Sequence, residues 1–147
     1  MKLDIDLLAY QDRLKIVLED GRRMIKDPVR KRNFVLQPEE VVRQLWMVYL
    51  HEQHDISFAS MAVEKQLIIG EVKRRFDLVI FKKGVPYILC EFKSHKIEIS
   101  NDTAMQAAHY NASLQVPYII LSNGAYSYCY SIDQDAQTVT VMSELPM

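Results

Sequence analysis

Three charged residues near the middle of the chain have types and spacing that suit phosphodiester chemistry. Asp77 follows Arg-Arg-Phe in a strand-like segment, and Glu91-Phe92-Lys93 comes after thirteen intervening residues. Side chains alternate between the two faces of a strand, so Glu91 and Lys93 share a face while Phe92 packs into the core. A turn at residues 82–84 would fold the two strands alongside each other, so that Asp77 and Glu91 can meet near the sheet edge.

These three residues have a defined chemical task. A pair of carboxylates forms a hard-oxygen site suited to Mg²⁺ or Mn²⁺. A metal bound there polarises a phosphate and lowers the pKa of a water, so that hydroxide can attack in line. Lys93 can hold that water or offset the charge that builds on the phosphate. We therefore expect metal-dependent hydrolysis of a phosphodiester.

A second E-x-K triplet, at Glu71 and Lys73, competes with this assignment. It lies in a polar, turn-like stretch after Gly70, and no aspartate stands on a preceding strand. Glu91 instead ends the apolar run 85–90, where a charged side chain would otherwise be unfavourable. Surface charges at a strand end are the competing interpretation of Glu91 and Lys93.

Turn signals and hydrophobic periodicity predict the elements that position these residues. Pro38, followed by two acidic residues, favours a helix start. Leu45, Trp46 and Tyr49 then recur at helical spacing with Val42 and give one apolar face. The pattern predicts an α/β fold with a mixed sheet flanked by helices, beginning as an antiparallel meander. The expected elements are a strand at 14–18, a helix at 37–51, strands at 61–69, 74–81 and 85–93, a helix from Asp102 or Thr103 to Leu114, and strands at 116–121, 125–132 and 138–142.

The second predicted helix has a polar face. Gln106 and Tyr110 are four residues apart and therefore lie on one side of the helix. Thr103 and Asn111 lie nearby, which makes this side more polar than a stripe that faces a core. A partly exposed helix is the plain interpretation, and a second wall of the reactive site is the functional one.

The order of these motifs is similar to that of a known nuclease superfamily. The PD-(D/E)xK nucleases with an added Q-x-x-x-Y motif have the same sequence of features, which here are Glu40, Asp77, Glu91-Phe-Lys93 and Gln106-x-x-x-Tyr110. The chain most resembles the N-terminal nuclease domain of the type I restriction enzyme R subunit. Asp27-Pro-Val-Arg, the segment 36–44 and the Ser122-Asn-Gly turn also resemble small stand-alone members of that family. The resemblance covers roughly residues 22–146.

The resemblance implies a restriction-endonuclease-like fold and a role for each matched residue. Asp77, Glu91 and the backbone carbonyl of Phe92 would bind Mg²⁺ or Mn²⁺. Glu40 would contact the metal directly or through water, and Lys93 would be the catalytic lysine. Gln106 and Tyr110 would organise the site or touch nucleic acid. Arg43 and Arg75 are further candidates for this role, taken from the basic residues of the sequence and not from the resemblance.

Two features depart from or extend the family pattern. Phe76 stands where the family usually has a proline before the first aspartate, and the chain has no room for a helicase motor. Arg43 lies about one helical turn after Glu39 and Glu40, so we expect a surface ion pair with one of them, or contact with a phosphate.

The composition is that of a soluble protein with one domain, residues 1–147, in which residues 1–21 are a possible N-terminal extension. Its 147 residues are 49% apolar and 25% charged, enough to bury a core without disulfides or zinc. No run of about 18 apolar residues predicts a membrane helix, and the N-terminus lacks a signal peptide, so we expect a cytoplasmic protein. Cys90 and Cys129 lie in apolar runs and are expected to be buried thiols.

The charge distribution bears on the partner. A net charge of −1 counts mildly against an avid general nucleic-acid binder. Basic clusters at 22–32, 73–75 and 82–83 could still contact phosphates, although solvated surface charge is the alternative. The chain contains neither the G-x-x-x-x-G-K motif of nucleotide hydrolases nor the G-x-S-x-G motif of serine hydrolases.

The leading expectation is a small Mg²⁺-dependent, endonuclease-like deoxyribonuclease. The alternative is a non-catalytic nucleic-acid-binding or interaction module that retains the nuclease fold. A third possibility is a subunit that needs a helicase, another restriction-system partner or a second copy of itself to bind DNA.

Overall fold

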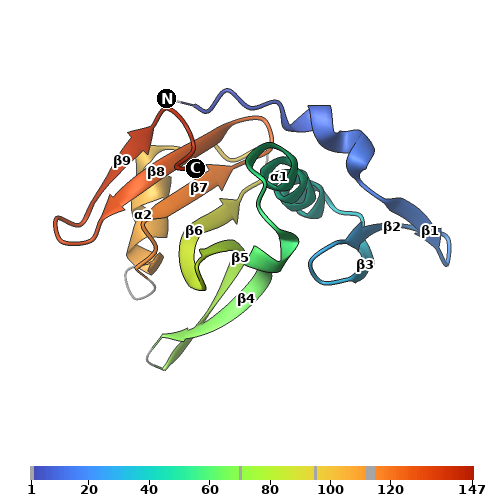
Figure 1. Cartoon of the computed structure of the whole chain (residues 1–147), viewed down its shortest axis with the longest axis horizontal. Coiled ribbons are helices and arrows are strands. Elements are labelled where there is room, and N and C mark those ends of the chain that lie inside the picture. Colours follow the sequence, from blue (N-terminus) through green and yellow to red (C-terminus); the bar gives the residue numbers. More distant parts are fainter. Residues whose placement is uncertain (1, 70, 95, 112–114) are drawn as a thin grey trace.

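The structure is a computed structural model that describes residues 2–69, 71–94, 96–111 and 115–147. A mixed sheet of six strands forms its centre, in the order β4-β5-β6-β7-β8-β9. Helix α1 (Pro38–His54) covers one face of this sheet and helix α2 (Asn101–Asn111) covers the other (Figure 1). The arrangement confirms the predicted α/β class with a mixed sheet between helices.

The strands of the central sheet lie close to their predicted positions. Two of them, β4 (Met61–Ile69) and β9 (Thr138–Met142), have the expected bounds, and the others shift by a few residues. The remaining strands are β5 (Val72–Lys82), β6 (Val85–Phe92), β7 (Tyr118–Ser122) and β8 (Ser127–Asp133).

The predicted meander is present. Strands β4, β5 and β6 pair antiparallel, and Lys83-Gly84 makes the turn between β5 and β6. Strand β6 then pairs with β7 in parallel, because α2 carries the chain back across the sheet between them. This crossover makes the sheet mixed. It also sets α2 beside β6 and β7.

Helix α1 ends later than predicted. The helix continues to His54 rather than His51, and Asp55 closes it with a left-handed φ of 57°. The N–H groups of Asp55 and Ile56 both reach the carbonyl of Leu50. The sequence offers neither glycine nor proline to mark this end, and aspartate is one of the few other residues that adopt such a backbone readily.

Helix α2 begins earlier than predicted. Ser100, not Asp102 or Thr103, precedes its first residue, and the Ser100 hydroxyl and N–H exchange hydrogen bonds with Thr103. This reciprocal pairing satisfies N–H groups that the first helical turn leaves without a partner. The predicted end at Leu114 lies outside the described residues.

Two apolar cores lie on the two faces of the sheet. Alternation along β6 sends Ile88, Cys90 and Phe92 toward α1, while Leu89 packs toward α2. Phe92 is therefore in the core, as expected. Cys90 and Cys129 are buried free thiols, which confirms their prediction.

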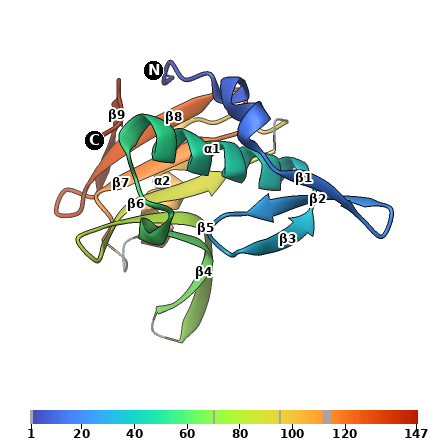
Figure 2. The ribbon, with the colours of Figure 1, turned by 45° about the vertical axis from the view of Figure 1, so that its right-hand side comes forward.

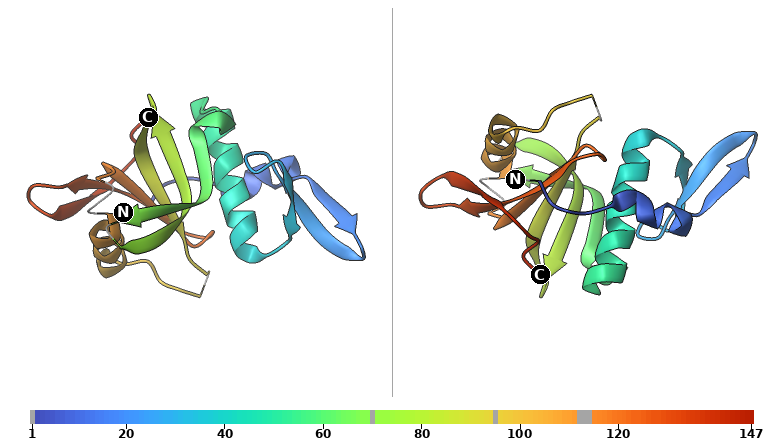
Figure 3. Two further views of the ribbon diagram at one scale, coloured as in Figure 1. Left: turned by 90° about the horizontal axis from the view of Figure 1, so that it is seen from below. Right: turned by 90° about the horizontal axis from the view of Figure 1, so that it is seen from above.

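The N-terminal residues form elements that the sequence only partly indicated. A 3₁₀ helix, η1 (Leu7–Arg13), packs along α1, and a sheet of three antiparallel strands follows it. These strands are β1 (Ile16–Glu19), β2 (Arg22–Asp27) and β3 (Arg32–Val35). The sequence predicts only the first of these strands, and the pattern of the basic stretch 22–32 indicates no strand. Figure 2 shows the small sheet beside α1, and Figure 3 shows α1 between it and the central sheet.

Helix α1 is buried around more of its circumference than one apolar stripe implies. Leu45 and Trp46 are buried as expected, and so are Met47 and Leu50. The central sheet covers one side, while η1 and the small sheet cover another.

Among the described residues, no helix is both long and apolar enough to cross a membrane.

Candidate active site

The pairing of β5 with β6 brings Asp77 and Glu91 to neighbouring positions. Leu78 pairs with Cys90, and both acids lie one residue beyond this pair, where the ladder ends. Asp77 continues the link between the strands with its side chain, because Oδ2 accepts a 2.7 Å hydrogen bond from the N–H of Phe92. The two acids and the strand that carries Lys93 are thus held together, as the spacing predicted.

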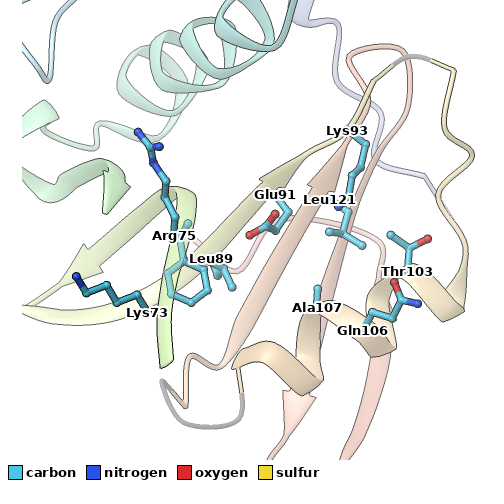
Figure 4. A pocket seen from close by; sticks show the side chains of 10 residues that line it. Lys73, Arg75, Leu89, Glu91, Lys93, Thr103, Gln106, Ala107 and Leu121 are labelled. Carbon is cyan, nitrogen blue, oxygen red and sulfur yellow. The ribbon is translucent and has the colours of Figure 1, made fainter. Parts of the chain in front are cut away.

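Glu91 and Lys93 line a cavity of about 280 Å³ between β5, β6 and α2. Lys93 is fixed from its backbone, since its N–H donates to the carbonyl of Ser122 at 2.8 Å. Thr103 and Gln106 line the cavity from α2, opposite β6 (Figure 4). The polar side of the second helix therefore faces the same space as the E-x-K motif.

The acids of the site lie where ionisation is unfavourable. Burial, reinforced by the charge of Asp77, raises the pKa of Glu91 to about 7, and Lys93 acts against this. Burial likewise raises the pKa of Asp77, while the Phe92 N–H and the cations of Arg43 and Lys93 oppose the rise. Two partly desolvated carboxylates that repel each other favour a bound cation or proton.

Asp77 also contacts α1 through Arg43. One guanidinium nitrogen, Nη2, lies 3.9 Å from Asp77 Oδ1, and Nη1 donates to Glu40 Oε1 at 2.6 Å. The Arg43 side chain is only 5% exposed. Arg43 therefore forms one of the two expected ion pairs, with Glu40, while Glu39 is exposed. The expected surface position is wrong, because the pair is buried.

The two carboxylate oxygens of Glu40 differ in their hydrogen bonding. Arg30 and Arg43 both bind Oε1. The second oxygen, Oε2, is buried and has no hydrogen-bond partner among the described residues. Such an atom is costly to leave unsatisfied, so it marks a place where a further ligand fits.

The Asp27-Pro-Val-Arg segment supplies Arg30. Asp27 is fully buried and accepts hydrogen bonds from the N–H groups of Val29 (2.7 Å) and Arg30 (2.9 Å) and from Arg30 Nε (2.6 Å). The Arg30 guanidinium stacks over Phe34, 3.4 Å from the ring centroid. This turn between β2 and β3 aims Arg30 at Glu40.

Glu64, in β4, belongs to the site although sequence reasoning missed it. It lies opposite Asp77 in the β4–β5 pair, where its φ of 52° interrupts the ladder. A left-handed backbone is unusual for a glutamate in a strand. Its carboxylate lies near three arginines, at 3.4 Å from Arg30, 3.5 Å from Arg43 and 2.5 Å from Arg75. The one feature of the sequence that could have indicated Glu64 is its charge near the middle of a predicted strand.

The structure places the remaining candidates as follows. Arg75 is exposed, and it and Lys73 line the cavity on the β5 side. Glu71, the acid of the competing triplet, is exposed next to the β4–β5 turn. The side chain of Tyr110 lies outside the described part of the structure, so its expected role stays a prediction.

The residues present fit a hydrated divalent ion better than a cage made wholly of protein. Within the described part of the chain, no three His, Cys, Asp or Glu side chains form a ready metal cluster. Mg²⁺ commonly binds through one or two carboxylates and keeps several waters. The carboxylates of Asp77 and Glu91 and the unpartnered Oε2 of Glu40 supply oxygens of the right kind for such an ion.

A comparison with family models identifies the family to which the chain is similar. The family model described as the N terminus of the type I restriction enzyme R protein matches residues 38–146. A search of curated proteins found no match. The matched segment begins at the start of α1 and contains Glu40, Glu64, Asp77, Glu91 and Lys93.

Proposed function

The chain belongs to the family of type I restriction enzyme R protein N-terminal domains, and we propose that it is a metal-dependent nuclease that hydrolyses DNA. One observation carries the proposal. Asp77 in β5 and Glu91 in β6 lie side by side where the pairing of these two strands ends, and Lys93 lines the same cavity as Glu91. A binding role alone does not call for two acids at neighbouring positions with a lysine beside them.

Each residue has a separate task in this proposal. Asp77 and Glu91 hold Mg²⁺ or Mn²⁺ with the carbonyl of Phe92, and Glu40 supports the ion with Oε2, directly or through water. The ion supplies the positive charge that polarises the phosphate and lowers the pKa of the attacking water. Lys93 orients that water or balances charge on the phosphate as the bond to the leaving oxygen breaks.

The surroundings of the cavity favour an anionic substrate. Lys73 and Arg75 line it together with Lys93, so three cationic side chains share the cavity with Glu91 (Figure 4). Local fields of this kind attract phosphates even when the whole protein has a net charge of −1. Gln106, on the facing helix, can donate a hydrogen bond to a phosphate or sugar oxygen.

Cleavage assays with a matched lysine pair test the proposal. Plasmid DNA and single-stranded DNA are incubated with the protein and Mg²⁺ or Mn²⁺, and product is quantified for wild type, Lys93→Ala and Lys96→Ala. Lys96 is an exposed residue just past the end of β6. We expect Lys93→Ala to lose about 100-fold or more in rate and Lys96→Ala to keep its rate. Equal rates for wild type and Lys93→Ala would remove the catalytic assignment.

A non-catalytic binding module is the second candidate. Arg43 already places a positive charge between Glu40 and Asp77, so the acids have a counter-ion without any metal. Titration calorimetry with Mn²⁺ separates the candidates, because a nuclease site binds the ion and loses it in Asp77→Asn. A wild-type protein that binds no Mn²⁺ would favour the module.

The family places the chain in a restriction-system context. We propose that a partner with helicase activity, or a second copy of this chain, extends the DNA-binding surface. Light scattering with and without DNA tests the second copy directly, since a stable dimer doubles the measured mass.

A further inference from the structure

We propose that Arg43 is an internal counter-ion that competes with the metal, and that Glu64 accepts its guanidinium when a divalent cation occupies Asp77. The inference rests on the proposed function, because it takes Asp77 and Glu40 as the acids that meet the ion. It assigns positioning roles to Arg43 and Glu64, neither of which touches the reacting phosphate.

The position of Arg43 Nη2 carries the first step. This nitrogen lies 3.9 Å from Asp77 Oδ1 and 3.5 Å from Glu64 Oε1, while Nη1 remains on Glu40 at 2.6 Å. A single nitrogen between two carboxylates can move fully onto either one through a small rotation of the guanidinium.

Charge explains why Arg43 has to move. An arginine stays protonated at all ordinary pH values, so it cannot lose its charge to make room for a second cation. In partly buried surroundings, two positive charges that share one carboxylate repel each other. An Arg43 that kept its place beside Asp77 would therefore weaken metal binding.

Burial explains why Arg43 needs a new partner rather than release into solvent. Its side chain is 5% exposed. Nη1 stays on Glu40, but a buried Nη2 that left Asp77 without another acceptor would be unsatisfied, which is unfavourable. Glu64 is arranged to receive it. Arg75 and Arg30 occupy Glu64 Oε2, at 2.5 and 3.4 Å, whereas Oε1 faces Arg43.

Arg30 keeps Glu40 in place while Arg43 shifts from Asp77 to Glu64. Arg30 binds the same Oε1 of Glu40 as Arg43 does, and Asp27 holds Arg30 in turn. Glu40 therefore stays anchored when Arg43 shifts, and its Oε2 remains directed to one place. The N-terminal β2–β3 turn thus helps to prepare the metal site from outside the matched segment.

Mn²⁺ titration calorimetry on matched variants tests the counter-ion. The proteins are wild type, Arg43→Gln and Arg22→Gln, which removes the same charge from an exposed position of the small sheet. We expect Arg43→Gln to bind Mn²⁺ about tenfold more tightly or better, and Arg22→Gln to stay within about twofold of wild type. Equal affinities for the two variants would overturn the counter-ion.

A double-mutant cycle with Glu64→Gln tests the acceptor. Glu64→Gln is expected to weaken Mn²⁺ binding about fivefold in the wild-type background and to have little effect in Arg43→Gln, because no arginine then needs a new partner. An effect of equal size in both backgrounds means that Glu64 acts only through its own charge, and it overturns the acceptor role.

Further outcomes separate this inference from the proposed function. Wild-type binding that Asp77→Asn abolishes but Arg43→Gln leaves unchanged removes the inference and keeps the metal site. No binding by wild type but binding by Arg43→Gln supports the inference, whereas no binding by either removes both. If Arg43→Gln does not fold, Arg43→Lys replaces it, since a single amine cannot span Glu40 and Asp77. Unchanged Mn²⁺ affinity in Arg43→Lys would then count against the counter-ion.

Discussion

Glu91 lies where burial and a neighbouring acid both oppose its negative charge. Its pKa rises from an ordinary value of 4.5 to about 7, with burial as the larger cause and Asp77 as the second. The cost belongs to the folded protein, because an unfolded chain exposes the same carboxyl to water. A site in which burial and a second carboxylate disfavour ionisation is suited to bind a cation, because the cation offsets the repulsion between Glu91 and Asp77.

The pH dependence of stability follows from that shift. The raised pKa means that the metal-free folded state gains from a protonated Glu91, and the gain is lost as pH rises from about 4.5 through 7. We therefore expect Glu91→Gln to be about as stable as wild type at pH 5 and more stable at pH 8, by on the order of 2 kcal/mol. Thermal unfolding in EDTA across this pH range measures the difference.

Glu98→Gln is the control for this prediction, because Glu98 is exposed in the segment between β6 and α2. Its effect on the melting temperature should be small and should not grow with pH. A Glu91→Gln effect of the same size at pH 5 and pH 8 would contradict the assignment of a strained carboxyl.

At the residue scale, the sequence predicted those parts of the site that depend on strand spacing. Asp77, Glu91 and Lys93 could be placed together because alternation and one turn fix their relative positions. Glu64 could not, since its side chain is directed by a left-handed backbone at a position that reads as ordinary strand. The burial of Arg43 was also beyond reach, because the small sheet that helps to cover α1 was not predicted.

At the scale of the elements, the Ser122-Asn-Gly124 turn connects the site to α1. Gly124 has a φ of +89°, and a Cβ there would lie 3.1 Å from Val42 Cγ2 on the helix. The carbonyl of Ser122 accepts the N–H of Lys93, so the same turn fixes the end of β6. A residue other than glycine would strain the backbone and press against α1.

Two glycine substitutions separate these effects. Gly124→Ala should lower the free energy of unfolding by about 2–3 kcal/mol, since it combines an unfavourable φ with the contact to Val42. Gly84→Ala should cost only about 1 kcal/mol, since φ is +75° but no atom of the described residues lies within 4 Å of the added Cβ. Urea denaturation compares them, and equal losses would mean that Val42 gives way without cost.

The elements also show where pattern reading works. The β5–β6 turn contains glycine and divides two apolar runs, so the meander was predicted correctly. The sequence does not predict strands β2 and β3. The residues of β2, Arg-Arg-Met-Ile-Lys-Asp, lack a regular apolar period, and the strand is held by pairing with β3. Their fixed feature, the Asp27–Arg30 turn, is stabilised by hydrogen bonds that no local propensity reveals.

At the scale of the whole molecule, the residues before the matched family segment belong to the same core as the site. Leu3 and Leu7 pack in the apolar cluster of α1 and the sheet, together with Trp46 and Ile88. The N–H of Leu3 also donates to the carbonyl of Ser127 in β8 at 2.7 Å. The match covers residues 38–146, yet η1 closes the side of α1 that this segment would leave open.

Adjacent leucines test how far the N-terminal segment supports the fold. Leu7 is 3% exposed and Leu8 is 63% exposed. Leu7→Ala therefore opens a cavity in the core, while Leu8→Ala only shortens a side chain that is exposed to solvent. We expect a loss of about 2–4 kcal/mol for the first and a change within about 0.5 kcal/mol for the second. Urea denaturation followed by the fluorescence of Trp46, the single tryptophan, measures both. Because Trp46 lies in the cluster that Leu7 joins, an unmoved transition in Leu7→Ala would mean that residues 38–146 fold without the N-terminal segment.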